Sequence, residues 1–116
     1  MAAEKGRSLK RRNIVFQLPV YHQKSGEVLG HLVDITTSGL KLVSTTPIES
    51  SRLFRLRMEL PEDYFKQRAL NFMARSRWTR PDVNPELSVT GLTMEGLDDE
   101  GKEVISGLVD LFGFND

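Results

Sequence analysis

Residues 34–39 read Asp-Ile-Thr-Thr-Ser-Gly and combine one carboxylate, three small hydroxyls and a glycine. An ionised Asp34 only accepts hydrogen bonds, whereas the hydroxyls of Thr36 and Ser38 donate or accept them. Gly39 permits a backbone conformation or a close approach that a side chain would block. The pattern predicts a hydrogen-bonding turn suited to a polar ligand. Asp34 also fits a second, compatible role as a side-chain cap of its own turn.

A second candidate group lies in the basic N-terminal segment. Residues 1–12 carry five basic side chains against Glu4 alone, and they show no apolar periodicity, which indicates a flexible arm. The guanidinium groups of Arg7, Arg11 and Arg12 are rigid forks that pair bidentately with phosphate or with a guanine edge. A mobile cationic arm facing a hydrogen-bonding turn suits an anionic ligand that bears a base.

Alternating apolar residues predict the strands that position these groups. The predicted strands cover residues 13–22, 27–35, 40–44, 53–60, 70–78 and 87–94. The clearest is the fourth, where Phe54, Leu56 and Met58 alternate with Arg55 and Arg57, so one face is buried and the other is wet. A turn at residues 24–26 joins the first two strands into a hairpin. Proline in the first strand predicts an edge or a bulge there, because proline cannot donate to a ladder.

The fifth predicted strand holds the single tryptophan of the chain. Alternation places Leu70, Phe72, Ala74 and Trp78 on one face and Arg75 and Arg77 on the other. We interpret Trp78 as a core aromatic, with stacking on a base near the barrel mouth as the alternative. The outward arginines are interpreted as a solvated face.

A helix is predicted from about residue 98 to residue 113. Asp98 or Asp99 caps its first turn, and Gly113 ends it. The helix has a buried stripe at helical spacing, formed by Val104, Ile105, Leu108, Leu111 and Phe112. Short strands followed by one amphipathic helix predict a mainly β fold, a small antiparallel barrel with the helix packed against it. The predicted organisation is an arm over residues 1–12 and one domain over residues 13–116.

Composition excludes several kinds of chemistry. The 116 residues contain no cysteine and two histidines, so neither disulfides, thiol catalysis nor a Cys- or His-rich metal site is expected. The chain lacks a nucleophile elbow, a phosphate loop and paired carboxylates with a general base, so we expect no catalytic residues and no cofactor. No apolar run approaches the ~20 residues of a membrane span, and no secretory signal is evident. We therefore expect a cytoplasmic protein without membrane insertion.

An arginine cluster before the first strand and a D/N-x-S-x-x-G turn after the second resemble the PilZ family. Here the turn carries Asp34, Thr36 and Gly39, with Thr in place of the usual Ser. The segments 30–36, 77–78, 90–92 and 111–114 are also similar to PilZ sequences, so the resemblance covers nearly the whole chain. It implies a six-stranded barrel that binds the bacterial second messenger cyclic di-GMP, a ligand rather than a cofactor, without being an enzyme. A PilZ receptor would relay the level of the messenger to a protein effector.

The arm departs from the family in its register. The family pattern is R-x-x-x-R with its second arginine directly before the first strand, where this chain has Leu9 and Asn13. Arg7 and Arg11 satisfy the spacing two residues earlier, and Arg12 is a further candidate. We therefore expect retained binding through this arm and through Asp34, Thr36, Ser38 and Gly39. The alternative is a divergent PilZ protein-interaction module with weak or no nucleotide binding.

A third interpretation, a binder of single-stranded nucleic acid, ranks last. Such a protein needs aromatic and basic residues interleaved on one exposed face. Here the aromatics fall mostly on inward faces, and the formal net charge is zero, with 16 basic and 16 acidic residues. We therefore expect neither DNA nor RNA as a partner.

Overall fold

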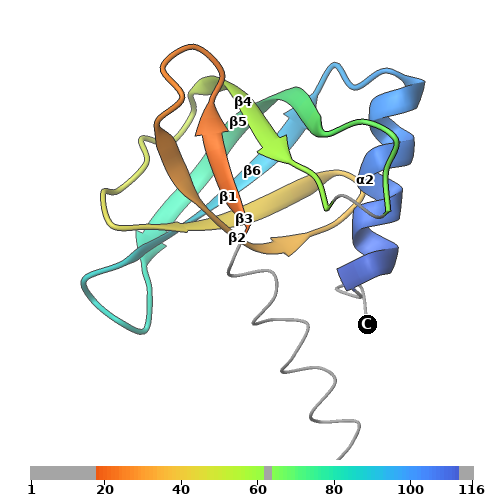
Figure 1. Ribbon diagram of the computed structural model, residues 1–116. Coiled ribbons are helices and arrows are strands. Elements are labelled where there is room, and N and C mark those ends of the chain that lie inside the picture. The colour runs from red at the N-terminus through yellow and green to blue at the C-terminus, as the bar shows by residue number, and fades with distance from the viewer. Residues whose placement is uncertain (1–17, 62–63, 113–116) are drawn as a thin grey trace, which may run out of the picture.

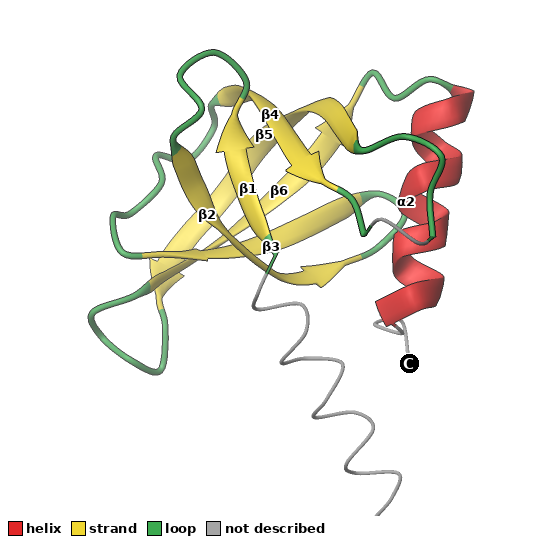
Figure 2. Cartoon of the chain, viewed as in Figure 1, coloured by secondary structure: helices red, strands yellow, loops and turns green. Residues whose placement is uncertain are grey.

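The computed structural model describes residues 18–61 and 64–112. Its architecture is a closed antiparallel barrel with one helix beside it (Figures 1 and 2). The strands are joined in the order β1-β2-β3-β6-β5-β4. Their bounds are β1 Pro19–His22, β2 Val28–Ile35, β3 Gly39–Ser44, β4 Leu53–Glu59, β5 Ala69–Pro81 and β6 Ser88–Glu95. The predicted mainly β fold of six strands is confirmed.

The core fills the barrel and continues under the helix α2 (Asp99–Phe112). Alternate residues of β4 point inward, and Leu56 and Met58 are fully buried. Of the predicted helical stripe, Val104, Ile105 and Leu108 are buried in this same cluster. Burying these side chains is the main force holding the helix on the barrel, since each is worth about 1.5–3 kcal/mol relative to exposure.

The N-terminus of α2 is capped as predicted. The carboxylate of Asp98 accepts a hydrogen bond of 2.8 Å from the backbone N–H of Gly101, and the acids of the first turn favour the positive end of the helix dipole. Farther along, Phe65 of the β4–β5 connection packs on the helix at Gly107, where an added Cβ would lie 2.9 Å from its ring. The predicted end of the helix at Gly113 lies outside the described residues. Within residues 18–61 and 64–112, no helix has the length and apolarity needed to cross a membrane.

Two strand boundaries differ from the prediction by more than one residue. β1 begins at Pro19, and residues 13–17 of the predicted strand lie outside the described part of the chain. Pro19 pairs with β2 while the β4 ladder begins one residue later, and a bulge follows Val20, so the missing N–H is accommodated at the strand start. At the other end, β5 continues past Trp78 to Pro81 because Arg80 still pairs with Val89 of β6.

Candidate functional site

A bulge in β2 decides where Asp34 points. Strict alternation would place Asp34 inside the barrel with Leu32, but the register shifts between these two residues. The extra residue turns the following side chains over, so that Ile35 is fully buried and Asp34 lies half-buried on the outer face. The bulge thus keeps the carboxylate of Asp34 out of the apolar core and places it on the outer face at the end of the strand.

A second bulge, in β5, turns Trp78 outward in the same way. The register shifts between Ser76 and Trp78, so that two residues of β5 oppose Gly91 of β6. Thr79 takes the inward position, where its hydroxyl donates to the carbonyl of Ile48. Trp78 is therefore half-buried on the outer face. The interpretation of Trp78 as a core residue aligned with Leu70, Phe72 and Ala74 is wrong, because alternation cannot anticipate the extra residue.

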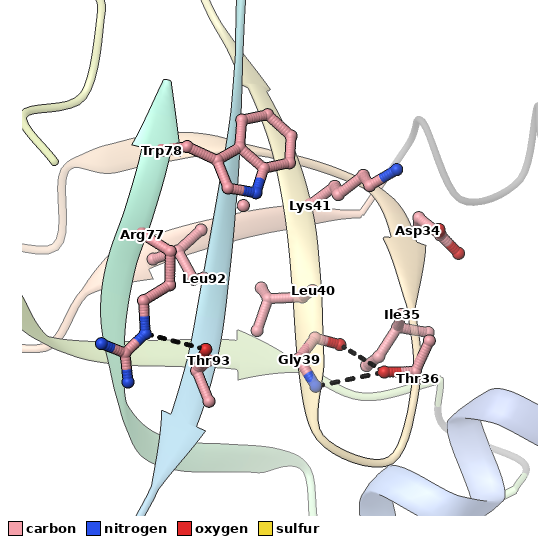
Figure 3. A pocket seen from close by; sticks show the side chains of 11 residues that line it. Asp34, Ile35, Thr36, Gly39, Leu40, Lys41, Arg77, Trp78, Leu92 and Thr93 are labelled. Atoms are coloured by element: carbon pink, nitrogen blue, oxygen red, sulfur yellow. Dashed lines mark hydrogen bonds between the residues drawn. The ribbon is translucent and has the colours of Figure 1, made fainter. Parts of the chain in front are cut away.

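The two bulges bring distant residues into one row across the outer face of the barrel. Asp34 of β2 lies opposite Lys41 of β3, Lys41 opposite Gly91 of β6, and Gly91 opposite Trp78 of β5. This row borders a pocket of about 200 Å³, shown in Figure 3. The pocket is lined by Asp34, Ile35, Thr36, Gly39, Leu40, Lys41, Arg77, Trp78, Gly91, Leu92 and Thr93. Its size, below the 300–1,000 Å³ typical of ligand sites, suits one part of a ligand such as a base.

The indole of Trp78 lies directly on the backbone at Gly91. A Cβ at position 91 would come within 2.4 Å of the indole Cε2, so only glycine leaves room for the ring. The guanidinium of Arg80 lies 4.4 Å from the ring centroid, at cation–π distance. The ring forms one wall of the pocket, packed against Gly91 and with the Arg80 guanidinium over its face, and a base that stacks there would take the place of that guanidinium.

The turn after β2 is held by the hydroxyl of Thr36. This oxygen accepts hydrogen bonds from the backbone N–H of Ser38 at 3.3 Å and of Gly39 at 3.2 Å, and the N–H of Thr36 donates to the carbonyl of Gly39 at 2.8 Å. The carbonyl of Ser38 in turn accepts from the N–H of Met94 in β6. Thr36 therefore plays the capping role that we considered for Asp34. Within residues 18–61 and 64–112, the carboxylate of Asp34 makes no hydrogen bond, and it lines the pocket.

Gly39 is needed for close approach of two strands. A Cβ on Gly39 would lie 2.6 Å from the carbonyl oxygen of Leu92, a backbone atom that cannot swing away. Its place at the start of β3, opposite Thr93, lets β3 and β6 pair tightly under the pocket. Of the two roles considered for this glycine, the structure favours close approach.

The two outward arginines of β5 beside the pocket, Arg75 and Arg77, are engaged by an acid and a hydroxyl. Arg77 donates from Nε to the hydroxyl of Thr93 at 3.1 Å (Figure 3), and its Nη2 lies 4.0 Å from Glu95. Arg75 donates from Nε to Glu95 at 2.8 Å. The hydrogen bond and the positive charge of Arg75 lower the pKa of Glu95 from its ordinary value of 4.5. The outward arginines of β5 thus lie on a solvated face, as predicted, and they are ion-paired with Glu95 there, which was not predicted.

The structure brings together part of the predicted site. Asp34, Thr36 and Gly39 line the pocket, whereas Ser38 sits in the turn without lining it. The predicted arm with Arg7, Arg11 and Arg12 lies outside the described residues. In the described part of the chain, no three His, Cys, Asp or Glu side chains are grouped so that they could hold a metal ion.

Two residues of the site escaped the sequence reasoning. Lys41 follows Gly39 by two positions, and this spacing alone could have placed both on the outer face of β3. Gly91 was noted as part of a similar segment but received no role. No pattern in the neighbouring sequence indicates that an indole packs on Gly91, because the ring comes from another strand.

The chain is thus a small closed β barrel with a polar turn and an aromatic wall around a pocket on its outer face. The sequence matches the PilZ domain family over residues 7–111, and the chain belongs to that family. The matched range includes the arginines of the arm as well as the turn and most of α2. No curated protein matches the chain at a significant level.

Solved structures share the fold at low sequence identity. The inhibitor of motility MotI/DgrA of Bacillus subtilis is 19% identical with a TM-score of 0.68, over 85% of this chain and 47% of that one. MrkH of K. pneumonia in its apo state is 14% identical with a TM-score of 0.64, over 84% and 46%. The PilZ domain of YcgR from Escherichia coli, solved with c-di-GMP, is 9% identical with a TM-score of 0.59, over 84% and 82%. The chain spans about half the length of the first two proteins.

Proposed function

We propose that this protein is a cyclic di-GMP receptor whose pocket lies beside the turn at residues 36–38. PilZ domains are regulatory binding modules, and the YcgR domain was solved with this ligand. The observation that carries the proposal is the row Asp34–Lys41–Gly91–Trp78, because it sets a carboxylate, a cation and an aromatic ring around one pocket. Each of these groups matches a part of a cyclic dinucleotide.

The assignment of roles follows from hydrogen-bonding chemistry. The carboxylate of Asp34 accepts hydrogen bonds from the N–H groups of a guanine, since an ionised carboxylate is an acceptor only. Trp78 offers a stacking surface for a base, an interaction worth about 1–3 kcal/mol per base. Thr36 and Gly39 shape the turn, and Ser38 adds a hydroxyl next to it.

In this proposal Arg7, Arg11 and Arg12 supply the remaining contacts from the arm. Their guanidinium groups bind the phosphates or the guanine edges by charge-assisted hydrogen bonds. Ordering of residues 1–12 over the barrel costs conformational entropy, which these bonds offset. The ordered arm then changes the surface that a protein effector recognises. The domain of residues 13–116 thereby acts as an adaptor between the ligand and the effector.

Isothermal titration with cyclic di-GMP tests the proposal. We expect the wild type to bind at tens of micromolar or tighter, equivalent to about −6 kcal/mol or more. Asp34→Ala and the triple variant Arg7→Ala/Arg11→Ala/Arg12→Ala should each weaken binding about tenfold or more, since each loses charged hydrogen bonds. Asp110→Ala, which removes an exposed carboxylate of α2, is the matched control and should bind as the wild type does. No heat with the wild type at these concentrations would refute the proposal.

A second function, a protein-interaction module that has lost the nucleotide, is favoured by the arm register. Leu9 and Asn13 stand where the family pattern has arginines. This alternative predicts an effector complex of unchanged affinity with and without cyclic di-GMP. The receptor proposal predicts that the ligand changes that affinity.

A further inference from the structure

Lys41 occupies the centre of the row that borders the pocket. It lies opposite Asp34 on one side and opposite Gly91 on the other, so its backbone is held by ladders to β2 and β6. Its side chain is exposed and lines the pocket. Figure 3 shows Lys41 between the Trp78 ring and the carboxylate of Asp34. The barrel thus carries a lysine at a fixed position within the pocket wall.

The other cation of the pocket is already engaged. Arg77 donates to Thr93 and lies near Glu95, as described above. Among the described residues, no carboxylate lies within 4.0 Å of the ammonium of Lys41, not even that of Asp34 across the ladder. Lys41 therefore brings to the pocket a positive charge that is not neutralised by an ion pair in the described part of the chain.

We propose that Lys41 binds a phosphate of the dinucleotide and anchors it to the barrel independently of the arm. This inference rests on the proposed function. An ammonium is a compact charge with three donors, which suits phosphate oxygens, and hydrogen bonds between charged groups are about twice as strong as neutral ones. Lys41 lies opposite Asp34 on the neighbouring strand and both line the pocket, so the pocket wall carries one positive and one negative group.

The opposite charges of Asp34 and Lys41 favour different chemical groups of the ligand and so determine its orientation. Asp34 repels a phosphate and accepts from a base N–H, while Lys41 attracts the phosphate and has no acceptor for that N–H. A ligand is thereby oriented with a base against Asp34 and Trp78 and a phosphate at Lys41. The arrangement also gives the chain a phosphate contact that does not depend on the arm positions held by Leu9 and Asn13.

Titration of single lysine variants with cyclic di-GMP tests the inference. We expect Lys41→Ala to weaken binding by about tenfold or more, equivalent to ~1.4 kcal/mol, and Lys41→Arg to bind within about threefold of the wild type. Lys24→Ala, which removes an exposed lysine from the β1–β2 turn, is the matched control and should not change the affinity. The affinity of Lys41→Ala should also fall less steeply with added salt than that of the wild type, because one screened contact is gone.

The outcomes separate this inference from the proposed function. If the wild type binds and Lys41→Ala binds equally well, the inference is overturned while the receptor function stands. If the wild type does not bind, the receptor function fails and the inference fails with it. If Lys41→Ala unfolds at the same temperature as the wild type, its weaker binding does not come from a loss of structure. If Lys41→Ala is destabilised, the affinity of Lys41→Arg tests the inference instead. Weak binding by Lys41→Arg as well as by Lys41→Ala would contradict a role for charge alone.

Discussion

Replacing Gly91 by alanine should displace the only tryptophan of the chain. The new Cβ would lie 2.4 Å from the indole Cε2 and 2.6 Å from Cζ2 and Nε1, about 1 Å short of ordinary contact at 3.4 Å. The backbone of Gly91 is fixed by pairing with both β3 and β5, so the ring of Trp78 must move. Overpacking of this kind costs about 1–3 kcal/mol unless the ring escapes into solvent.

Tryptophan fluorescence and thermal unfolding measure this displacement. Because Trp78 is the only tryptophan, the emission reports this site alone. We expect Gly91→Ala to shift the emission to longer wavelength as the ring becomes more exposed. If the ring stays in place under strain, the melting temperature should instead fall by about 4 °C or more, as expected for 1 kcal/mol in a domain of this size.

Gly101→Ala serves as the matched control. It introduces the same methyl group in α2, where the nearest atom is the flexible end of Leu97 at 3.0 Å, so the emission should not change. An emission spectrum and a melting temperature of Gly91→Ala both equal to the wild type would refute the packing of Trp78 on Gly91. Trp78 would then not form the pocket wall described above.

Two further predictions concern the turn and the ion pair beside the pocket. The hydroxyl of Thr36 accepts from two backbone N–H groups, so Thr36→Val should lower the free energy of unfolding by about 1 kcal/mol in urea denaturation. Thr36→Ser keeps the hydroxyl and should retain the stability. Equal losses in both variants would contradict the role of the hydroxyl. The carboxyl of Glu95 should titrate below 4.5 by NMR, and Arg75→Ala should raise its midpoint; an unchanged midpoint would contradict the ion pair. Since the pKa is lowered in the folded state, the stabilisation is present at neutral pH and is lost as the pH falls through the lowered pKa.

The barrel was largely predictable because its strands follow a simple period. Clean alternation in β4 marked Phe54, Leu56 and Met58 as buried, and all three are. The helix was predictable from its apolar stripe and from the capping residue Asp98. These features depend on neighbours in the sequence, so a local pattern is sufficient to find them.

The site was predictable only in part. The composition of the turn pointed to Asp34, Thr36 and Gly39, and these residues do line one pocket. Which of them caps the turn was not predictable, since Asp and Thr both cap turns through side-chain oxygens. The assignment to Thr36 depends on the bulge that carries Asp34 to the outer face. The roles of Arg7, Arg11 and Arg12 stay predictions, because these residues lie outside the described part of the chain.

The sequence by itself determined the strands, the helix and the polar turn, because periodicity, proline, glycine and capping residues act over a few neighbouring positions. Only the tertiary structure decided that Asp34 and Trp78 face the same pocket. Each is turned outward by one extra residue in its strand. At the β5 bulge, the hydroxyl of the next residue, Thr79, donates to the distant carbonyl of Ile48. The meeting of Lys41, Gly91 and Trp78 likewise requires β3, β6 and β5 to be paired, which no local pattern specifies.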